Sequence, residues 1–153
     1  PAVKTTTPPK MDGVITDSVW LTAPEAKQFI VNFPNYGSVP KKPTLVKVLY
    51  TNEALYVAAH LYDVPDSIRH QLTSRDREER QDCDVFGVAI DTYSDKQNAF
   101  QFLVTSANVQ SDVRISANSD NEFDYNWDAV WDSHVTIVPD GWTVEIKIPY
   151  MAL

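Results

Sequence analysis

The strict alternation of residues 142–148 constrains the fold of this chain more than any other feature. The segment reads WTVEIKI, so a Trp, a Val and two Ile residues share one face while Thr, Glu and Lys share the other. Successive side chains of a β-strand point to opposite faces, which gives this period of two. We therefore predict a half-buried antiparallel strand, with Trp142 in the core and Glu145 on the polar face.

Two pairs of further segments also resemble strands. Residues 45–50 and 55–62 are rich in β-branched and aromatic side chains and are joined by the polar sequence TNEA, which suits a hairpin. Residues 85–90 and 100–104 are apolar on both faces, as expected of central strands.

Residues 109–115 and 131–137 return to alternation, which places Asp112 on a polar face and favours Trp131 in the core. Helical signals are limited to residues 16–20, where Thr16 or Asp17 could cap a turn, and to residues 66–72. Many short strands without strand–helix alternation predict an all-β, antiparallel β-sandwich, jelly-roll-like, with one or two short helical turns.

The length of 153 residues fits one domain, and we expect an N-terminal extension at residues 1–8 followed by the sandwich domain at residues 9–153. The chain ends in IPYMAL, within a segment typical of a core, so we expect it to be part of a longer polypeptide.

The net charge of −8 disfavours nucleic acid and anionic membrane surfaces as partners, because both carry negative charge. No apolar stretch approaches the length of a membrane helix, so we expect no membrane insertion by this domain. Cys83 is the only cysteine, which excludes an internal disulfide and a thiolate zinc site.

Four blocks of the sequence, in order, resemble the carbohydrate-binding family 9. Residues 9–20 (PKMDGVITDSVW) resemble the entry motif IDG-x-x-D-x-x-W of that family, in which the Trp plugs one end of the sandwich. Residues 46–63 resemble its hairpin V-x-V-L-Y…L-Y-V…D, and residues 84–91 and 141–150 continue the match. The blocks cover nearly the whole chain, and their shared order is more specific than any one of them.

Within the family, residues 71–76, 98–100 and 126–131 look like the branch that forms the N-terminal domain of large exported Bacteroidetes-type proteins. The resemblance implies an extracytoplasmic location (secreted, periplasmic or outer-membrane associated) and a role in carbohydrate binding linked to polysaccharide breakdown or uptake. It implies no catalysis by this domain, although the full-length protein could be associated with glycoside hydrolysis.

One departure from the family pattern concerns the sugar site. Sugar-binding members hold a terminal sugar between two aromatic side chains, one just before the strand that begins at Asp84 and one beyond the I-P-Y strand. Here the first position falls near Gln81, with Arg77 to Arg80 around it, and the second would lie past Leu153. The aromatic pair of the family is therefore not visible in this chain.

The richest aromatic cluster surrounds Trp127, with Tyr125 nearby and Asp128 as a neighbouring carboxylate. Flat aromatic faces suit the C–H faces of a sugar ring and the carboxylate could hold hydroxyls, so these residues are candidates for carbohydrate binding. The alternative is that Trp127 covers the end of the core, and both interpretations stand at this point. Arg75 with Asp84 forms a second candidate polar site, for which a solvated charged loop is the alternative.

Two oxygen-rich loops are weak candidates for structural calcium, because hard cations prefer carboxylate and carbonyl oxygens. The candidate ligands are Asp91, Asp95, Asp120 and Asp124, and neither loop has EF-hand spacing. Ordinary acidic surface loops are the alternative, and we expect no other cofactor.

Two functional hypotheses follow from the sequence. The first is a non-catalytic module that binds a neutral glycan. The second is a structural domain that has lost sugar binding and docks onto the C-terminal remainder of its own polypeptide. An enzyme is the weakest hypothesis, because no nucleophile, base and orienting group are placed together, and the carboxylates of Asp112 and Glu145 show no sign of a shared cleft.

Overall fold

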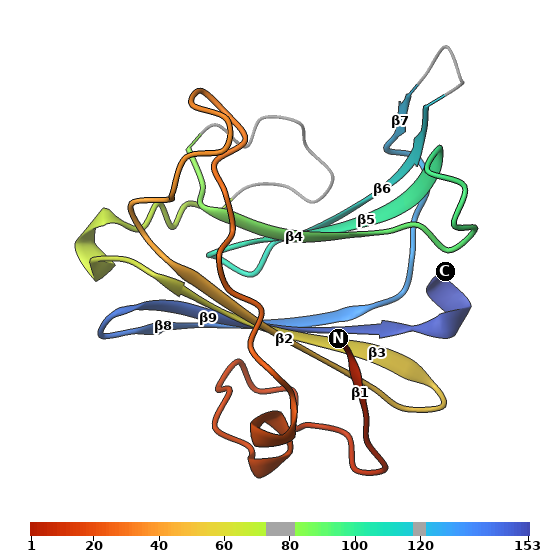
Figure 1. Cartoon of the computed structure of the whole chain (residues 1–153), viewed down its shortest axis with the longest axis horizontal. Helices are drawn as coiled ribbons and strands as arrows, with labels where there is room; N and C mark the ends of the chain where they lie inside the picture. Colours follow the sequence, from red (N-terminus) through yellow and green to blue (C-terminus); the bar gives the residue numbers. More distant parts are fainter. Residues whose placement is uncertain (73–81, 118–121) are drawn as a thin grey trace.

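The computed structural model describes residues 1–72, 82–117 and 122–153, and these build two stacked antiparallel sheets (Figure 1). The five-stranded sheet has the order β1-β2-β3-β9-β8 and the four-stranded sheet the order β4-β5-β6-β7. All strand pairs are antiparallel except β1 with β2. The strands are β1 (Val3–Lys4), β2 (Thr44–Tyr50), β3 (Ala54–Tyr62), β4 (Val85–Ile90), β5 (Asn98–Thr105), β6 (Gln110–Ser116), β7 (Phe123–Asp124), β8 (Asp132–Val138) and β9 (Gly141–Pro149).

The predicted β-sandwich is confirmed, and the helical content of the described residues is limited to three 3₁₀ turns. They are η1 (Ser18–Thr22), η2 (Pro65–Ser67) and η3 (Tyr150–Ala152). The expected cap of the first turn is wrong: neither Thr16 nor Asp17 caps it with its side chain, because the Asp17 carboxylate accepts a hydrogen bond from the Lys10 amide instead. No helix of the described residues is long and apolar enough to cross a membrane.

The main core lies between the two sheets. The inward side chains of β9, namely Trp142, Val144, Ile146 and Ile148, pack there with Phe102, Val104 and Trp131. The prediction of core positions for Trp20, Trp131 and Trp142 is confirmed, since all three are buried. One strand position differs from the prediction: β5 is central, but β4 forms an edge of its sheet.

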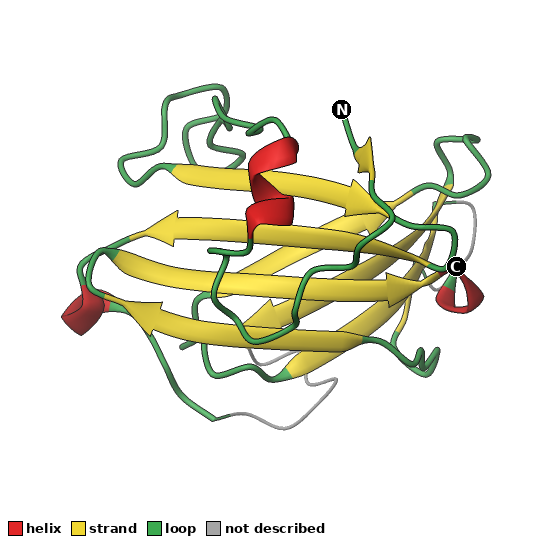
Figure 2. Cartoon of the chain, turned by 90° about the horizontal axis from the view of Figure 1, so that it is seen from below, coloured by secondary structure: helices red, strands yellow, loops and turns green. Residues whose placement is uncertain are grey.

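A third layer covers the outer face of the five-stranded sheet. The N-terminal segment and its turn η1 cross this face (Figure 2), and Trp20 packs there against Leu49, Tyr56 and Ala58. The prediction that β9 is half-buried is therefore wrong. Thr143 and Glu145 on its outer face are also buried, because this segment excludes water from them.

Glu145 fastens the N-terminal segment to the sheet. One carboxylate oxygen accepts a hydrogen bond from the Trp20 indole Nε1 at 2.8 Å, and the other accepts the backbone amides of Asp12 at 3.0 Å and Gly13 at 2.9 Å. Burial raises the pKa of the Glu145 carboxyl above its ordinary value, and the nearby charge of Asp12 acts in the same direction, against these three hydrogen bonds. The expected polar-face position of Glu145 is wrong because its side chain meets buried donors rather than water.

Gly13 is the residue that permits this approach. Its φ of +78° lies in the left-handed region, and a Cβ atom there would come within 2.7 Å of Thr136 Oγ1 and 3.1 Å of the Val135 carbonyl carbon. The Asp-Gly pair of the entry motif thus has a structural reason: glycine lets the backbone lie against β8 while its amide reaches Glu145.

The first residues of the chain also join the sheet. Val3 and Lys4 form β1, which pairs in parallel with Leu49 and Tyr50 of β2. Part of the expected N-terminal extension thus extends the edge of the five-stranded sheet.

Candidate functional site

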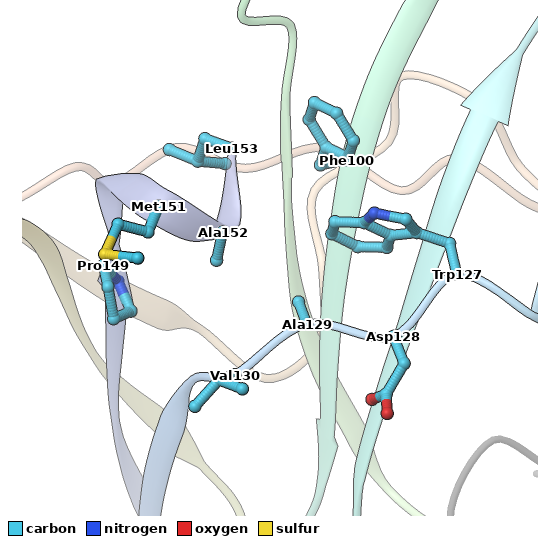
Figure 3. A pocket seen from close by; sticks show the side chains of 9 residues that line it. All are labelled: Phe100, Trp127, Asp128, Ala129, Val130, Pro149, Met151, Ala152 and Leu153. Atoms are coloured by element: carbon cyan, nitrogen blue, oxygen red, sulfur yellow. The ribbon is translucent and has the colours of Figure 1, made fainter.

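A cleft of about 620 Å³ opens at the end of the sandwich where β9 finishes (Figure 3). The segment between β7 and β8 forms one wall, the start of β5 adds an aromatic ring, and the turn η3 forms the opposite wall. The lining residues are Phe100, Trp127, Asp128, Ala129, Val130, Pro149, Met151, Ala152 and Leu153. The cleft is therefore mainly apolar, with one carboxylate among its lining side chains.

Trp127 supplies the largest aromatic surface of the cleft. Its indole packs against Phe100, with ring centroids 4.7 Å apart, and meets Phe102 of the core edge-on at 5.9 Å. Unlike the other three tryptophans, Trp127 is only partly buried. The ring closes the end of the core, as one interpretation expected, and it also lines a solvent-accessible cleft, so carbohydrate binding by Trp127 stays a prediction.

Asp112 of β6 holds the wall that carries Trp127. Its carboxylate accepts hydrogen bonds from the Ala129 backbone amide at 2.7 Å and from the Trp131 indole Nε1 at 3.1 Å. The predicted polar-face position of Asp112 is wrong: it lies directly opposite Phe102 in the sheet, so it shares the face that points into the core. No local sequence pattern indicates this position, because the two donors come from a loop 17 and 19 residues further along.

Tyr125 and Asp128 occupy different places around the cleft. Asp128 is exposed and lines it, and in Figure 3 its carboxylate points away from the space between Trp127 and Leu153. Tyr125 is not among the lining residues, and its ring stacks on Phe123 with centroids 6.5 Å apart. Of these candidates, the structure brings only Trp127 and Asp128 together at one opening.

Asp84 lies at the other end of the sandwich. It lines a smaller cavity of about 150 Å³ together with Tyr62 and Trp142, which stand where β3 ends and β9 begins. Trp142 and Pro149 of β9, the latter in the cleft, are seven residue steps apart, a distance of roughly 23 Å along an extended strand. The Asp84 carboxylate accepts a hydrogen bond from the Arg69 amide at 3.1 Å. Its proposed partner Arg75, like Gln81, lies outside the described residues.

The described calcium candidates are each engaged by protein groups. The Asp91 carboxylate accepts the amides of Asp95 and Lys96, which closes the turn between β4 and β5. Hydrogen bonds from the Asn98 side chain and the amides of Asn98 and Gln97 lower the pKa of Asp95. Asp124 forms an ion pair with Arg114 at 2.8 Å.

Asp120 lies outside the described residues, and among those described no three His, Cys, Asp or Glu side chains gather as a metal site. Calcium binding remains a prediction.

Two antiparallel sheets with an aromatic-lined cleft at one end define the chain as a β-sandwich domain with a candidate ligand site. The sequence model of the carbohydrate family 9 binding domain-like family matches residues 11–153, and the chain belongs to this family. Its members are non-catalytic carbohydrate-binding modules, so this domain is a binding module and not an enzyme.

Solved structures share the fold at low sequence identity. A family 9 carbohydrate-binding module from Caldicellulosiruptor kristjanssonii in complex with cellotriose aligns with a TM-score of 0.63 and 20% identity, covering 97% of this chain and 66% of that one. The same type of module from that organism in complex with glucose gives a TM-score of 0.65 and 19% identity, covering 96% and 67%.

A candidate carbohydrate-binding protein from Bacteroides uniformis gives a TM-score of 0.72 and 12% identity, covering 99% of this chain and 72% of that one. The chain thus spans about two thirds of the Caldicellulosiruptor modules. Comparison with curated proteins gives no significant match.

Proposed function

We propose that this domain binds a neutral glycan in the cleft beside Trp127. The observation that carries the proposal is that a partly exposed indole lines a cleft of about 620 Å³ in a chain of a carbohydrate-binding family. An aromatic face packs against the C–H face of a pyranose. The Asp128 carboxylate points away from the space beside Trp127, so it would accept hydrogen bonds from sugar hydroxyls at the rim of the cleft. The neighbours bound to cellotriose and glucose make glucose-based oligosaccharides the first ligands to test.

The test is a glycan array followed by calorimetric titration, with and without calcium. We expect millimolar to micromolar affinity for the wild type and at least a tenfold loss, about 1.4 kcal/mol, for Trp127→Ala. Trp127→Phe keeps an aromatic face and is expected to retain part of the affinity. Thermal melting of each variant checks folding, since Trp127 also packs on Phe100 and Phe102. A folded Trp127→Ala variant with unchanged affinity would show that the glycan does not bind in this cleft.

A second candidate function is a docking domain that packs on a further part of its own polypeptide. The apolar lining of the cleft favours it: Met151 is 100% exposed and Val130 is 87% exposed, and such apolar surface is typical of interaction sites. In that case peroxide should oxidise Met151 rapidly in the domain and slowly in the full-length protein. Equal rates in both would count against docking at this cleft.

The cellular setting is part of the same proposal. We infer that the protein is exported and that glycan binding serves polysaccharide breakdown or uptake, on the basis of its resemblance to domains of large exported proteins. Cell fractionation tests the location, and recovery of the protein only in the cytoplasm would overturn it.

A further inference from the structure

The loop of residues 28–40, here called the aromatic loop, exposes apolar side chains to an unusual degree. Phe33 is 85% exposed, Tyr36 is 78% exposed and Val39 is 87% exposed, and Phe29 and Ile30 are also exposed. Single exposed apolar residues are normal on a protein surface, but a concentration in one short segment marks an interaction surface.

The aromatic loop is a closed turn with defined hydrogen bonds. The amides of Val31 and Gly37 donate to the carbonyls of Ser38 and Val31, both at 2.9 Å. The Ser38 amide and hydroxyl both donate to the Asn35 carbonyl, at 3.2 and 2.8 Å. These hydrogen bonds fix the backbone of the turn, so the backbone that carries the exposed rings needs little ordering when a ligand binds.

The polar groups of the aromatic loop are all uncharged. No charged residue lies between Lys27 and Lys41, in a chain in which 22% of the residues are charged. Within the described part of the chain, the side-chain amides of Asn32 and Asn35, which flank Phe33, make no hydrogen bond. Each amide offers both donors and an acceptor to a ligand.

We propose that the aromatic loop is a second glycan contact of this domain, a proposal that rests on the function proposed above. Phe33 and Tyr36 would pack on sugar rings while Asn32 and Asn35 bond to hydroxyls. An uncharged loop with free amides suits a neutral polyhydroxylated ligand. A lipid surface is a poorer match, because membrane-binding loops add Lys or Arg and the net charge of −8 repels anionic lipids.

The aromatic loop and the Trp127 cleft lie at opposite ends of the sandwich. The loop leads into Lys42 and Pro43, which line the small cavity with Trp142, whereas Pro149 at the other end of β9 lines the cleft. In Figure 1 the loop forms the orange excursion at upper left and the C-terminus lies at the right. A trisaccharide therefore occupies one contact at a time, while a polysaccharide can engage both and gain avidity.

The experiment compares short and long ligands on a Phe33→Ala/Tyr36→Ala double variant. Trisaccharides (cellotriose, mannotriose, xylotriose) are titrated by calorimetry, and hydroxyethylcellulose, glucomannan and arabinoxylan are tested by affinity electrophoresis. Both residues are exposed, so the thermal melting temperature of the double variant should stay close to that of the wild type. Tyr93→Ala is the matched control, because Tyr93 is a 70% exposed aromatic in another turn.

We expect the double variant to lose polysaccharide affinity about tenfold while trisaccharide binding and the Tyr93→Ala control stay unchanged. Equal polysaccharide binding by wild type and double variant would overturn the second contact and leave the cleft proposal standing. A wild type that binds no ligand of the panel would overturn both proposals. If the double variant lost the wild type's binding to phosphatidylcholine vesicles but kept its polysaccharide binding, the glycan assignment would be overturned and the loop would be a lipid contact.

Discussion

Asp112 and Glu145 perform the same structural task in different sheets, Asp112 between the sheets and Glu145 on the outer face of the five-stranded sheet. Each is buried, and each accepts a hydrogen bond from a tryptophan indole and from the backbone of a distant loop. Buried carboxylates are costly unless their lone pairs are satisfied, and charge-assisted hydrogen bonds supply that compensation. Asp112 thereby positions the cleft wall, and Glu145 positions the N-terminal segment.

Glu145 makes the stability of the domain depend on pH. Because burial raises the pKa of its carboxyl in the folded state, its contribution to stability is fully present below the ordinary pKa and is lost as pH rises through the raised value. In urea titrations between pH 4 and 8, the free energy of unfolding of the wild type relative to Glu145→Gln should therefore fall with increasing pH. A difference that grows with pH would show that the three hydrogen bonds outweigh burial and lower the pKa.

At the scale of elements, the turn η1 is anchored by one side chain. Trp20→Phe keeps a ring in the outer cluster but removes the donor to Glu145, and it should reduce the free energy of unfolding by about 1–3 kcal/mol. Urea denaturation measures the loss. Leu21→Ala in the same turn is the control and should cost at most about 0.5 kcal/mol, because Leu21 is exposed. Equal effects of the two substitutions would show that the indole hydrogen bond contributes nothing.

Most strands could be predicted from the sequence because β-branched and alternating segments carry their own signal. Residues 142–148 and the hairpin of residues 45–62 appear where they were expected. Alternation says which residues share a face but not what covers that face, so the burial of Glu145 beneath η1 could not be derived. Trp127 and Asp128 could be grouped from the sequence because they are neighbours in the chain. The opposite wall of the cleft comes from η3 through a tertiary contact, which no local pattern encodes.

At the scale of the whole molecule, the two hydrophobic clusters share the five-stranded sheet. The inner cluster uses Val57 of β3 and Ile146 of β9, and the outer cluster uses Tyr56 and Ala58 on the other face of β3. Loss of either layer exposes that sheet, so we expect one cooperative thermal transition, with equal calorimetric and van't Hoff enthalpies. An early transition that exposes Trp20 to solvent while Trp131 and Trp142 stay buried would show that the outer layer unfolds independently.

The position of β9 has a further consequence for how the molecule opens. This strand pairs with β3 on one side and β8 on the other, and both its faces are covered. Its backbone amides can therefore meet solvent only when the entire domain unfolds. In deuterated water the amides of β9 should be the last to exchange, at a rate that reports global unfolding. The two-residue edge strand β1 should exchange within the earliest measurement.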